Sequence, residues 1–329
     1  MAVADAVSDR TATAAAAKTG RSSGSLGDRI FYYLTFFFAV FVLAILAAIM
    51  ISLVHGSLPA FRKLGFAFFY SSAWNPVTDV FGALPSIYGT IVTSIIAILF
   101  GVPISFGIVI VLTELAPVWL RRPISTAVEL LAAIPSIIYG MWGLFVFVPF
   151  FKADIQPWLG AILSPIPIFG DLFSGPPFGV GMLTAGLILA IMILPFISAV
   201  MRDVFETVPP MLRESAYGLG ATTWEVVWNV ILPYTRTSVV GAIMLGLGRA
   251  LGETMAVTFV IGNSHDISAS LFLPGATISS TIANEFTEAV GDVYSSSLIA
   301  LGLTLFFITF VVLVIAKLML KQLASKVRG

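Results

Sequence analysis

The chain has 329 residues, of which 58% are hydrophobic and only 10% are charged, and its mean hydropathy is +1.03. A soluble globule needs far more polar surface, so the composition indicates an integral membrane protein. The formal net charge is zero, which provides no bulk field for attracting nucleic acid. The absence of cysteine excludes disulfides, thiol catalysis and metal sites with cysteine ligands.

The first 28 residues differ in composition from the rest of the chain. They are rich in Ala, Ser, Thr and Gly and contain no apolar stretch, so we expect a disordered cytoplasmic tail at residues 1–28 rather than a signal peptide. A transit peptide would share the Arg and Ser content, but it would be poor in acidic residues. Asp5, Asp9 and Asp28 argue against that alternative.

Six apolar stretches follow, and each exceeds the ~20 residues that a helix needs to cross a bilayer. They do not alternate polar and apolar residues, which excludes the strands of a membrane barrel. The sequence therefore predicts an all-α integral membrane protein with a six-helix transmembrane domain at 29–321 and a cytoplasmic tail at 322–329. The stretches are Ile30–Val54, Leu84–Thr113, Leu130–Phe151, Phe178–Met201, Thr237–Gly262 and Val293–Ala316.

Lys and Arg are distributed unequally between the two sides of these stretches. Thirteen belong to the N-terminal tail, the second and fourth connections and the C-terminus, whereas Arg62, Lys63 and Lys152 lie on the opposite side. The positive-inside rule therefore predicts that both termini and the long connection at 202–236 are cytoplasmic. We expect Glu114 and Glu129, near the cytoplasmic helix ends, to be solvated.

The external connections are too short to form separate domains. The aromatic-rich segment His55–Ala83 predicts an interfacial helix whose rings rest at the membrane surface. Lys152–Pro177 contains five prolines, which predicts a mostly irregular segment. Asn263–Asp292 carries four acidic residues and no basic one, an unfavourable entrance for a freely diffusing anion.

One apolar stretch, Thr237–Gly262, contains a charged pair, Arg249 and Glu253. We expect one continuous helix with Arg249 about 18 Å from its cytoplasmic end, close to the bilayer centre. Charges at that depth are costly, and a guanidinium facing a pathway can replace the lost hydration of an anion with directed donors. Gly248 and Gly252 form a small-xxx-small pair, which predicts tight packing of a neighbouring helix beside the charges.

The cytoplasmic segment 202–236 predicts two short helices. The first follows Pro209 and Pro210 and ends near Gly218 and Gly220. The second begins at a capping box formed by Thr222 and Glu225 and runs to Pro233. From the physics alone, these amphipathic helices either lie on the bilayer or present a surface to a partner protein.

The same segment resembles the EAA motif of ABC importer permeases. Glu214, Ser215 and Ala216 correspond to the Glu-Ala-Ala triplet, Gly220 to the glycine and Leu232-Pro233 to the Leu-Pro end. Ser215 replaces the middle alanine. The resemblance implies a coupling helix that docks on a separate ATP-hydrolysing subunit, with Glu214, Ser215, Ala216 and Gly220 at the contact.

Further segments resemble the PstC-type permeases of phosphate importers over residues 26 to 325, with only the N-terminal tail departing. They are the Gly82-Ala83-Leu84-Pro85 segment with Tyr88-Gly89-Thr90, Ile134-Pro135-Ser136 with Tyr139-Gly140 and Trp142-Gly143, Gly248–Val257, and Ala283–Phe286. This resemblance, and not composition, implies the type I importer permease fold and phosphate as the substrate. It also implies an external phosphate-binding protein, a related second permease and a pair of ATPase subunits that bind ATP and Mg²⁺.

The resemblance places Arg249 and Glu253 on the substrate pathway. For Glu253 two interpretations stay open, a structural counter-ion of Arg249 or a group that holds Arg249 until phosphate competes for it. An anion channel or an ion-coupled symporter would also use an intramembrane arginine, but neither needs the EAA-like segment. No zinc-protease, nucleophile or ATP-binding phosphate-loop motif is present, so we expect a transport subunit without cofactors of its own rather than an enzyme.

Overall fold

A computed structural model of the protein describes residues 26–167 and 169–325. Six helical segments in this part of the chain are long and apolar enough to cross a membrane, which confirms the predicted number. Most of the predicted N-terminal tail, residues 1–25, lies outside the described residues, whereas residues 26–28 already belong to the first helix. The last helix continues to Ser325, so residues 322–325 are helical and only 326–329 lie outside the described part.

The first helix, α2 (Leu26–Leu64), belongs to two compact units, because the division between them falls at Ser52 and Leu53. Within the first unit, the described chain is the helix from Leu26 to Ser52. Aromatic side chains four residues apart stack along it, with 6.0 Å between the ring centroids of Phe37 and Phe41.

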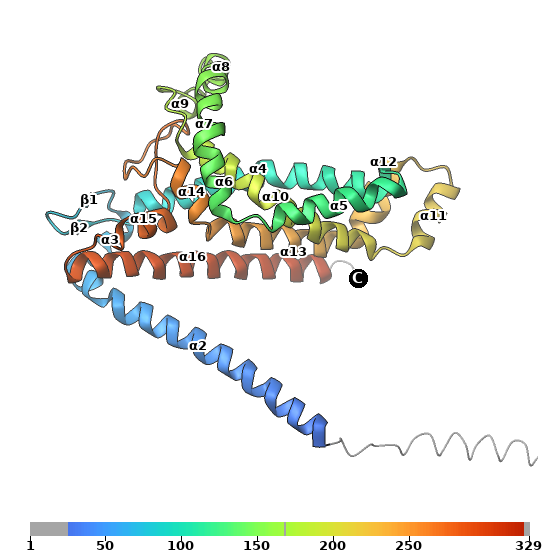
Figure 1. The fold of residues 1–329 in the computed structure, drawn as a ribbon, viewed down its shortest axis with the longest axis horizontal. Coiled ribbons are helices and arrows are strands. Elements are labelled where there is room, and N and C mark those ends of the chain that lie inside the picture. The colour runs from blue at the N-terminus through green and yellow to red at the C-terminus, as the bar shows by residue number, and fades with distance from the viewer. Residues whose placement is uncertain (1–25, 168, 326–329) are drawn as a thin grey trace, which may run out of the picture. The chain divides into compact units, whose positions relative to one another are not determined.

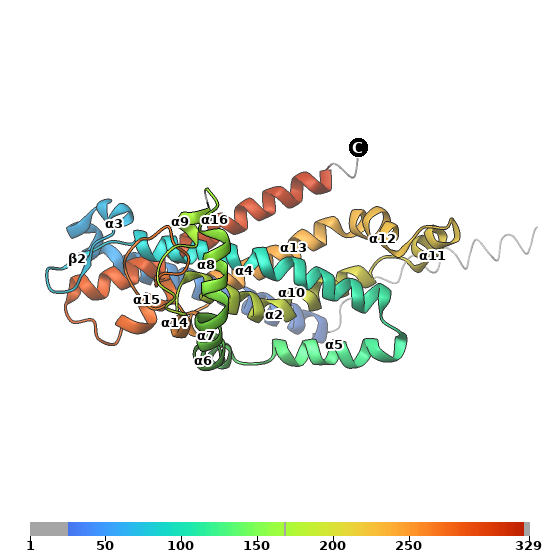
Figure 2. The same ribbon diagram turned by 90° about the horizontal axis from the view of Figure 1, so that it is seen from above.

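Within the second unit, four long helices lie side by side (Figures 1 and 2). They are α4 (Leu84–Ile110), α10 (Met182–Glu206), α13 (Leu232–Leu251) and α16 (Asp292–Ser325). Helix α10 contacts both α4 and α13, and α13 contacts α16. Because it is covered on several sides, α10 is the most buried span and supplies core residues such as Ile193, Ile197 and Met201.

The third span differs from the predicted stretch Leu130–Phe151 at both ends. Residues Leu130–Ala132 belong to a separate helix, α5 (Val118–Ala132), and the span itself begins after Pro135, which disfavours helical backbone before it. The span then stays helical to Leu163, so the prediction of a mostly irregular Lys152–Pro177 is wrong over its first half. Its segments are α6 (Ser136–Trp142), η2 (Gly143–Phe147), α7 (Val148–Phe150), η3 (Phe151–Ile155) and α8 (Gln156–Leu163), and α9 (Phe169–Leu172) follows.

Three prolines inside the spans follow π-helical turns, whereas Pro103 and Pro195 lie within the α-helices α4 and α10. Pro149, Pro157 and Pro233 each lie in the first turn after such a turn. In a π-turn the amide bonds to the carbonyl five residues back, which loosens the helix where proline lacks its donor. The helices therefore continue through residues that would end them in an ideal α-helix.

The predicted interfacial helix in His55–Ala83 is wrong. Helix α2 continues to Leu64, and the segment then forms α3 (Ala67–Tyr70) and a small antiparallel hairpin of β1 (Trp74–Asn75) and β2 (Val80–Phe81). Phe68 and Phe81 are fully buried and pack with Tyr294 and Leu298 of α16. These rings form a small core at one end of the helices instead of resting on the membrane surface.

Helix α4 is joined at the same end to α15 (Ile278–Glu285) and to the segment before it. The amide of Ile278 donates to Thr90 Oγ1 at 2.9 Å, and the hydroxyls of Ser86 and Thr281 lie 3.0 Å apart. Gly89 has no room for a side chain, because a methyl group there would overlap the carbonyl oxygen of Ala276. This contact fixes the start of α4 to α15.

Candidate functional site

The segment that resembles the EAA motif forms helix α11 (Pro210–Gly218), close to the predicted bounds. It ends in a Schellman turn, in which the amide of Ala221 bonds to the Ala216 carbonyl and that of Gly220 to the Tyr217 carbonyl. Gly220 adopts φ +89°, a left-handed conformation that favours glycine. Glu214 and Ser215 are exposed, whereas Ala216 packs against the main core. The turn thus presents the acidic side of α11 away from the protein.

Helix α11 is anchored to the body by Arg213. Its guanidinium donates to the carbonyl of Phe205 and forms an ion pair with Glu114, with 3.4 Å between Nη1 and Oε1. The Glu114 side chain is only 5% exposed, so the prediction that this carboxylate is solvated is wrong. The sequence carried no signal for this pair, because its two residues lie on different helices.

The second predicted helix begins as expected but does not end at Pro233. Thr222 and Glu225 form the capping box, with the Thr222 amide donating to the Glu225 carboxylate at 2.8 Å. The helix passes from α12 (Thr223–Val226) through the π-turn η4 (Val227–Ile231) directly into α13. The segments α12, η4 and α13 therefore form one continuous helical rod.

Arg249 lies in the last turn of α13, because the predicted helix Thr237–Gly262 breaks after Leu251. The guanidinium is about 20 Å beyond Arg236 along the axis, which keeps it well inside the span. It lies 5.7 Å from the ring centroid of Phe196 on α10 and interacts electrostatically with Tyr139 on α6. Its side chain is exposed, and none of the ion pairs between described residues includes it.

Glu253 lies in the break and has a different partner from the predicted one. Its Oε1 accepts a hydrogen bond from the amide of Ala256 at 3.2 Å, within the first turn of α14 (Met255–Val260). A carboxylate is favourable at a helix N-terminus, so Glu253 stabilises the start of α14. The predicted Arg249–Glu253 ion pair is therefore not formed in the part of the chain that the structure describes.

The glycines beside Arg249 do not pack against a helix of this chain. A methyl group added to Gly248 would meet no described atom, and one at Gly252 would meet only the Gly248 carbonyl oxygen. The tight contact lies elsewhere, where Gly140 of α6 approaches the backbone of Met255 and Ala256. The small-xxx-small prediction was therefore wrong within this chain, and the face of α13 next to Arg249 is open.

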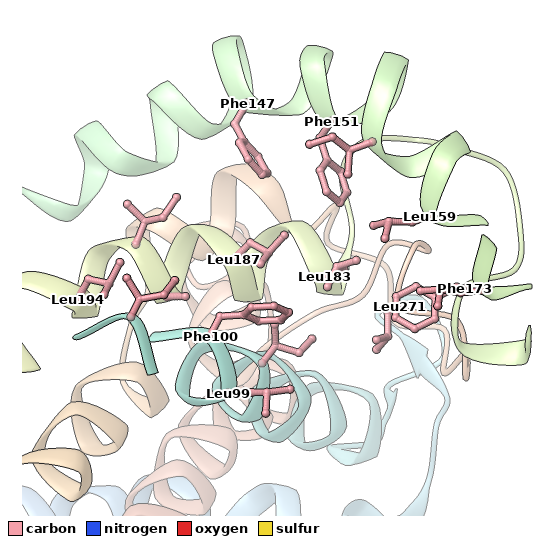
Figure 3. Close-up of a pocket in the computed structure, with 16 residues that line it drawn as sticks. Leu99, Phe100, Phe147, Phe151, Leu159, Phe173, Leu183, Leu187, Leu194 and Leu271 are labelled. Atoms are coloured by element: carbon pink, nitrogen blue, oxygen red, sulfur yellow. The ribbon is translucent and has the colours of Figure 1, made fainter. Parts of the chain in front are cut away.

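A groove of about 520 Å³ runs between α4, α10 and the third span, but its chemistry does not suit an anion (Figure 3). Every residue that lines it is Ile, Leu, Phe or Ala, so it offers no side-chain donor to a charged substrate. Phe100, Phe147 and Leu187 point into it (Figure 3). Among the described residues, Arg249 therefore remains the better candidate for an anion contact.

Glu285 connects the acidic external segment to neighbouring elements through hydrogen bonds. The Glu285 carboxylate accepts from Trp74 Nε1 and from the Tyr294 hydroxyl, both at 2.7 Å, and lies 2.8 Å from His265 Nε2. Burial by itself raises the pKa of Glu285, but the bonds with His265, Tyr294 and Trp74 outweigh it and hold the pKa below its ordinary value. Glu285 thus ties the hairpin, α15 and α16 together.

Solved structures with a similar fold are transmembrane chains of ABC importers. A bacterial ABC transporter involved in the import of the acidic polysaccharide alginate matches with a TM-score of 0.60 and 18% identity, covering 90% of this chain and 96% of that one. The inward-facing MetNI methionine ABC transporter matches with a TM-score of 0.56 and 16% identity, covering 76% and 99%. The fold, with α11 exposed at one end and Arg249 within a span, is that of type I ABC importer permeases.

Sequence comparisons define the family more closely. The model described as "Binding-protein-dependent transport system inner membrane component" matches residues 104–329. The Phosphate transport system permease protein PstC of Pasteurella multocida is 59% identical over 310 residues, 94% of this chain and 97% of that protein. The protein of that name from Mesorhizobium japonicum is 59% identical over 302 residues, 92% of each chain. The chain therefore belongs to this inner membrane component family and, within it, to the PstC-type permeases, which are transport subunits and not enzymes.

Proposed function

We propose that this chain forms half of the translocation pathway of an ATP-driven importer of inorganic phosphate. The substrate follows from membership of the PstC-type permeases, and the structure supplies a compatible group, the Arg249 guanidinium. Arginine offers several planar donors to phosphate oxygens and stays charged at physiological pH. Its exposed side chain and its lack of an ion-pair partner among the described residues are the observations that favour a substrate contact.

Energy is supplied through α11. We assign Glu214, Ser215, Ala216 and Gly220 to a docking surface for a separate ATPase subunit, which binds the ATP and Mg²⁺ that this chain does not bind. The exposed side chains of Glu214 and Ser215 and the compact turn at Gly220 support this assignment. Since α12, η4 and α13 are one rod, a push at this end of the molecule reaches Arg249 along a continuous helix.

In the proposed cycle, an external binding protein delivers phosphate to this chain and a related second permease. ATP closes the two ATPase subunits, which move the coupling helices and open the cavity outward, and hydrolysis resets the cavity inward. Delivery by a binding protein fits the acidic external segment, which does not attract a free anion. The Lys and Arg distribution supports a cytoplasmic position for both termini and for α11.

The break beside Arg249 gives Glu253 a defined part in this site. By accepting the Ala256 amide, Glu253 holds the start of α14 and leaves the guanidinium free for a substrate. Glu253 thus shapes the pathway next to the anion contact rather than neutralising it. The open face at Gly248 then lets the substrate approach closely.

The test is uptake by the full importer, reconstituted with its second permease, ATPase and binding protein in liposomes. We expect ATP-dependent uptake of radiolabelled phosphate and little uptake of sulfate. Phosphate uptake without ATP would instead identify an ion-coupled transporter or a channel. ATP-dependent uptake of sulfate in preference to phosphate would contradict the proposed substrate.

A further inference from the structure

A buried ion pair connects the coupling helix with α4. Glu114 lies in η1 (Val111–Leu115), the π-helical turn that continues α4, and pairs with Arg213 of α11. The hydroxyl of Tyr217, one turn further along α11, lies 3.5 Å from the other Glu114 oxygen. Glu114 thus faces two side chains of α11 that bracket the docking triplet.

Besides this pair, α11 contacts the neighbouring segments α12 and η4. None of its residues is fully buried, and Arg213 makes a further side-chain bond to the described body by donating to the Phe205 carbonyl of α10. Ala216 adds a modest apolar contact with the core. The Arg213–Glu114 pair is therefore the polar link through which a displacement of α11 acts on α4.

Helix α4 carries such a displacement to the opposite end of the molecule. From Leu84 to Leu115 it is helical throughout and spans about 47 Å at the helical rise. Its first turns are bonded to α15 through Thr90 and packed against Ala276 through Gly89. A rigid helix held at both ends moves α11 and α15 together.

We propose that Glu114 is a positioning residue for coupled transport, which makes α4 follow α11 when the ATPase pushes on it. This inference rests on the proposed function of α11 as the ATPase contact. Glu114 contacts neither substrate nor ATPase in this role. Its removal leaves ATP hydrolysis possible but disconnects hydrolysis from the rearrangement of the pathway.

The first test compares transport per ATP in the reconstituted full importer. Glu114→Gln keeps the shape of the side chain but removes its charge. Losing one partner of a buried pair shifts an equilibrium roughly tenfold or more. We therefore expect the number of phosphate ions transported per ATP hydrolysed to fall about tenfold. The matched control is Glu129→Gln, which breaks a more exposed pair with Arg202 between α5 and α10 and is expected to leave the ratio unchanged. The exchange of Glu114→Arg with Arg213→Glu restores a pair and should recover most of the ratio.

The second test does not depend on the identity of the substrate, and its wild-type arm needs no Glu114 variant. The chain has no cysteine, so spin labels can be attached to cysteines introduced at Leu115 and Leu219, which are both exposed. In the complex with wild-type Glu114, the distance between the labels should stay constant when ATP is added, and with Glu114→Gln it should change.

Two results overturn the proposal. One is a wild-type transport ratio in an assembled Glu114→Gln complex, and the other is a label distance that changes with ATP while Glu114 is intact. If the wild-type importer moves no phosphate, the proposed function fails, whereas the label distances still report whether α4 follows α11.

Discussion

The C-terminal ends of helices α11 and α13 are specified in different ways, the first by local signals and the second by tertiary contacts. The end of α11 at Gly220 follows from local signals, because glycine takes the left-handed conformation and the Schellman bonds join residues three and five positions apart. The end of α13 at Leu251 is not specified locally, since the stretch continues to be apolar to Gly262. Contacts with α6 and a carboxylate bond to α14 are associated with the break. The proposed docking surface thus depends on local signals, whereas the proposed substrate contact depends on tertiary ones.

Substitution of Arg249 has the largest expected effect, and it should affect uptake through the end of α13 without affecting ATPase docking on α11. Arg249→Gln should lower phosphate uptake about hundredfold or more while the importer assembles, because the glutamine carries no charge and fewer donors. Arg249→Lys should retain partial uptake, since a point charge lacks the planar fork. Uptake in liposomes and co-purification of the ATPase measure the two properties. Arg236→Gln, at the other end of the helix, is the control, and normal uptake by Arg249→Gln would remove Arg249 from the pathway.

Substitution of Glu285 tests how much tertiary hydrogen bonds between distant segments contribute to stability. Glu285→Gln should lower the free energy of unfolding by about 1–3 kcal/mol, because Trp74, Tyr294 and His265 lose a charged partner. Thermal unfolding of the purified complex measures the change. Glu288→Gln, an exposed neighbour, should have little effect, and equal losses in both variants would show that the network contributes nothing specific.

The same network predicts a pH dependence. Because the pKa of Glu285 is lower in the folded protein, its contribution is complete above the ordinary glutamate pKa of about 4.3 and is lost as the pH falls through the folded pKa. The difference in unfolding temperature between wild type and Glu285→Gln should therefore shrink on acidification from pH 6 toward about pH 3. A difference that grows as the pH falls would contradict the assigned direction.

Substitution of Gly220 tests whether the locally specified turn after α11 shapes the ATPase contact. Gly220→Ala forces a side chain into a left-handed conformation, which costs about 1–2 kcal/mol and should weaken ATPase docking roughly five- to thirtyfold. Gly218→Ala provides the matched control, because a methyl group meets no described atom at either position and Gly218 is helical. Titration of the purified ATPase onto the permease measures docking. Equal affinities for the two variants would show that the turn does not shape the contact.

The smallest expected effect concerns the capping box. Thr222→Ala removes the acceptor for the Glu225 amide and should cost about 1 kcal/mol of stability, with little change in uptake. Thermal unfolding of the complex compared with Thr223→Ala, one residue further along, isolates the cap. A large loss of uptake would mean that Thr222 takes part in docking as well.

Features that depend on short spacings could be predicted from the sequence. The number of spans follows from apolar runs that exceed the bilayer thickness, and the bounds of α11 and the start of the helix after Thr222 follow from proline, glycine and Thr-x-x-Glu signals. Pro157 misled the prediction of Lys152–Pro177, because it lies in the first turn after the π-helical turn η3 and the helix continues to Leu163. The aromatic run before α4 was placed on the membrane because amphipathic sequence alone does not reveal the partner that buries Phe68 and Phe81.

The sequence by itself determined the membrane class, the turn at Gly220 and, through its motifs, the importer family. Only the tertiary structure decided that Arg249 lies in the last turn of α13 and that Glu253 bonds to the start of α14 instead of pairing with Arg249. It also decided that Glu114 is buried against Arg213. The physical reason is the range of the interactions. Hydrophobic runs and helix caps act over a few residues, whereas the partner of a buried charge is chosen by helices far apart in the chain.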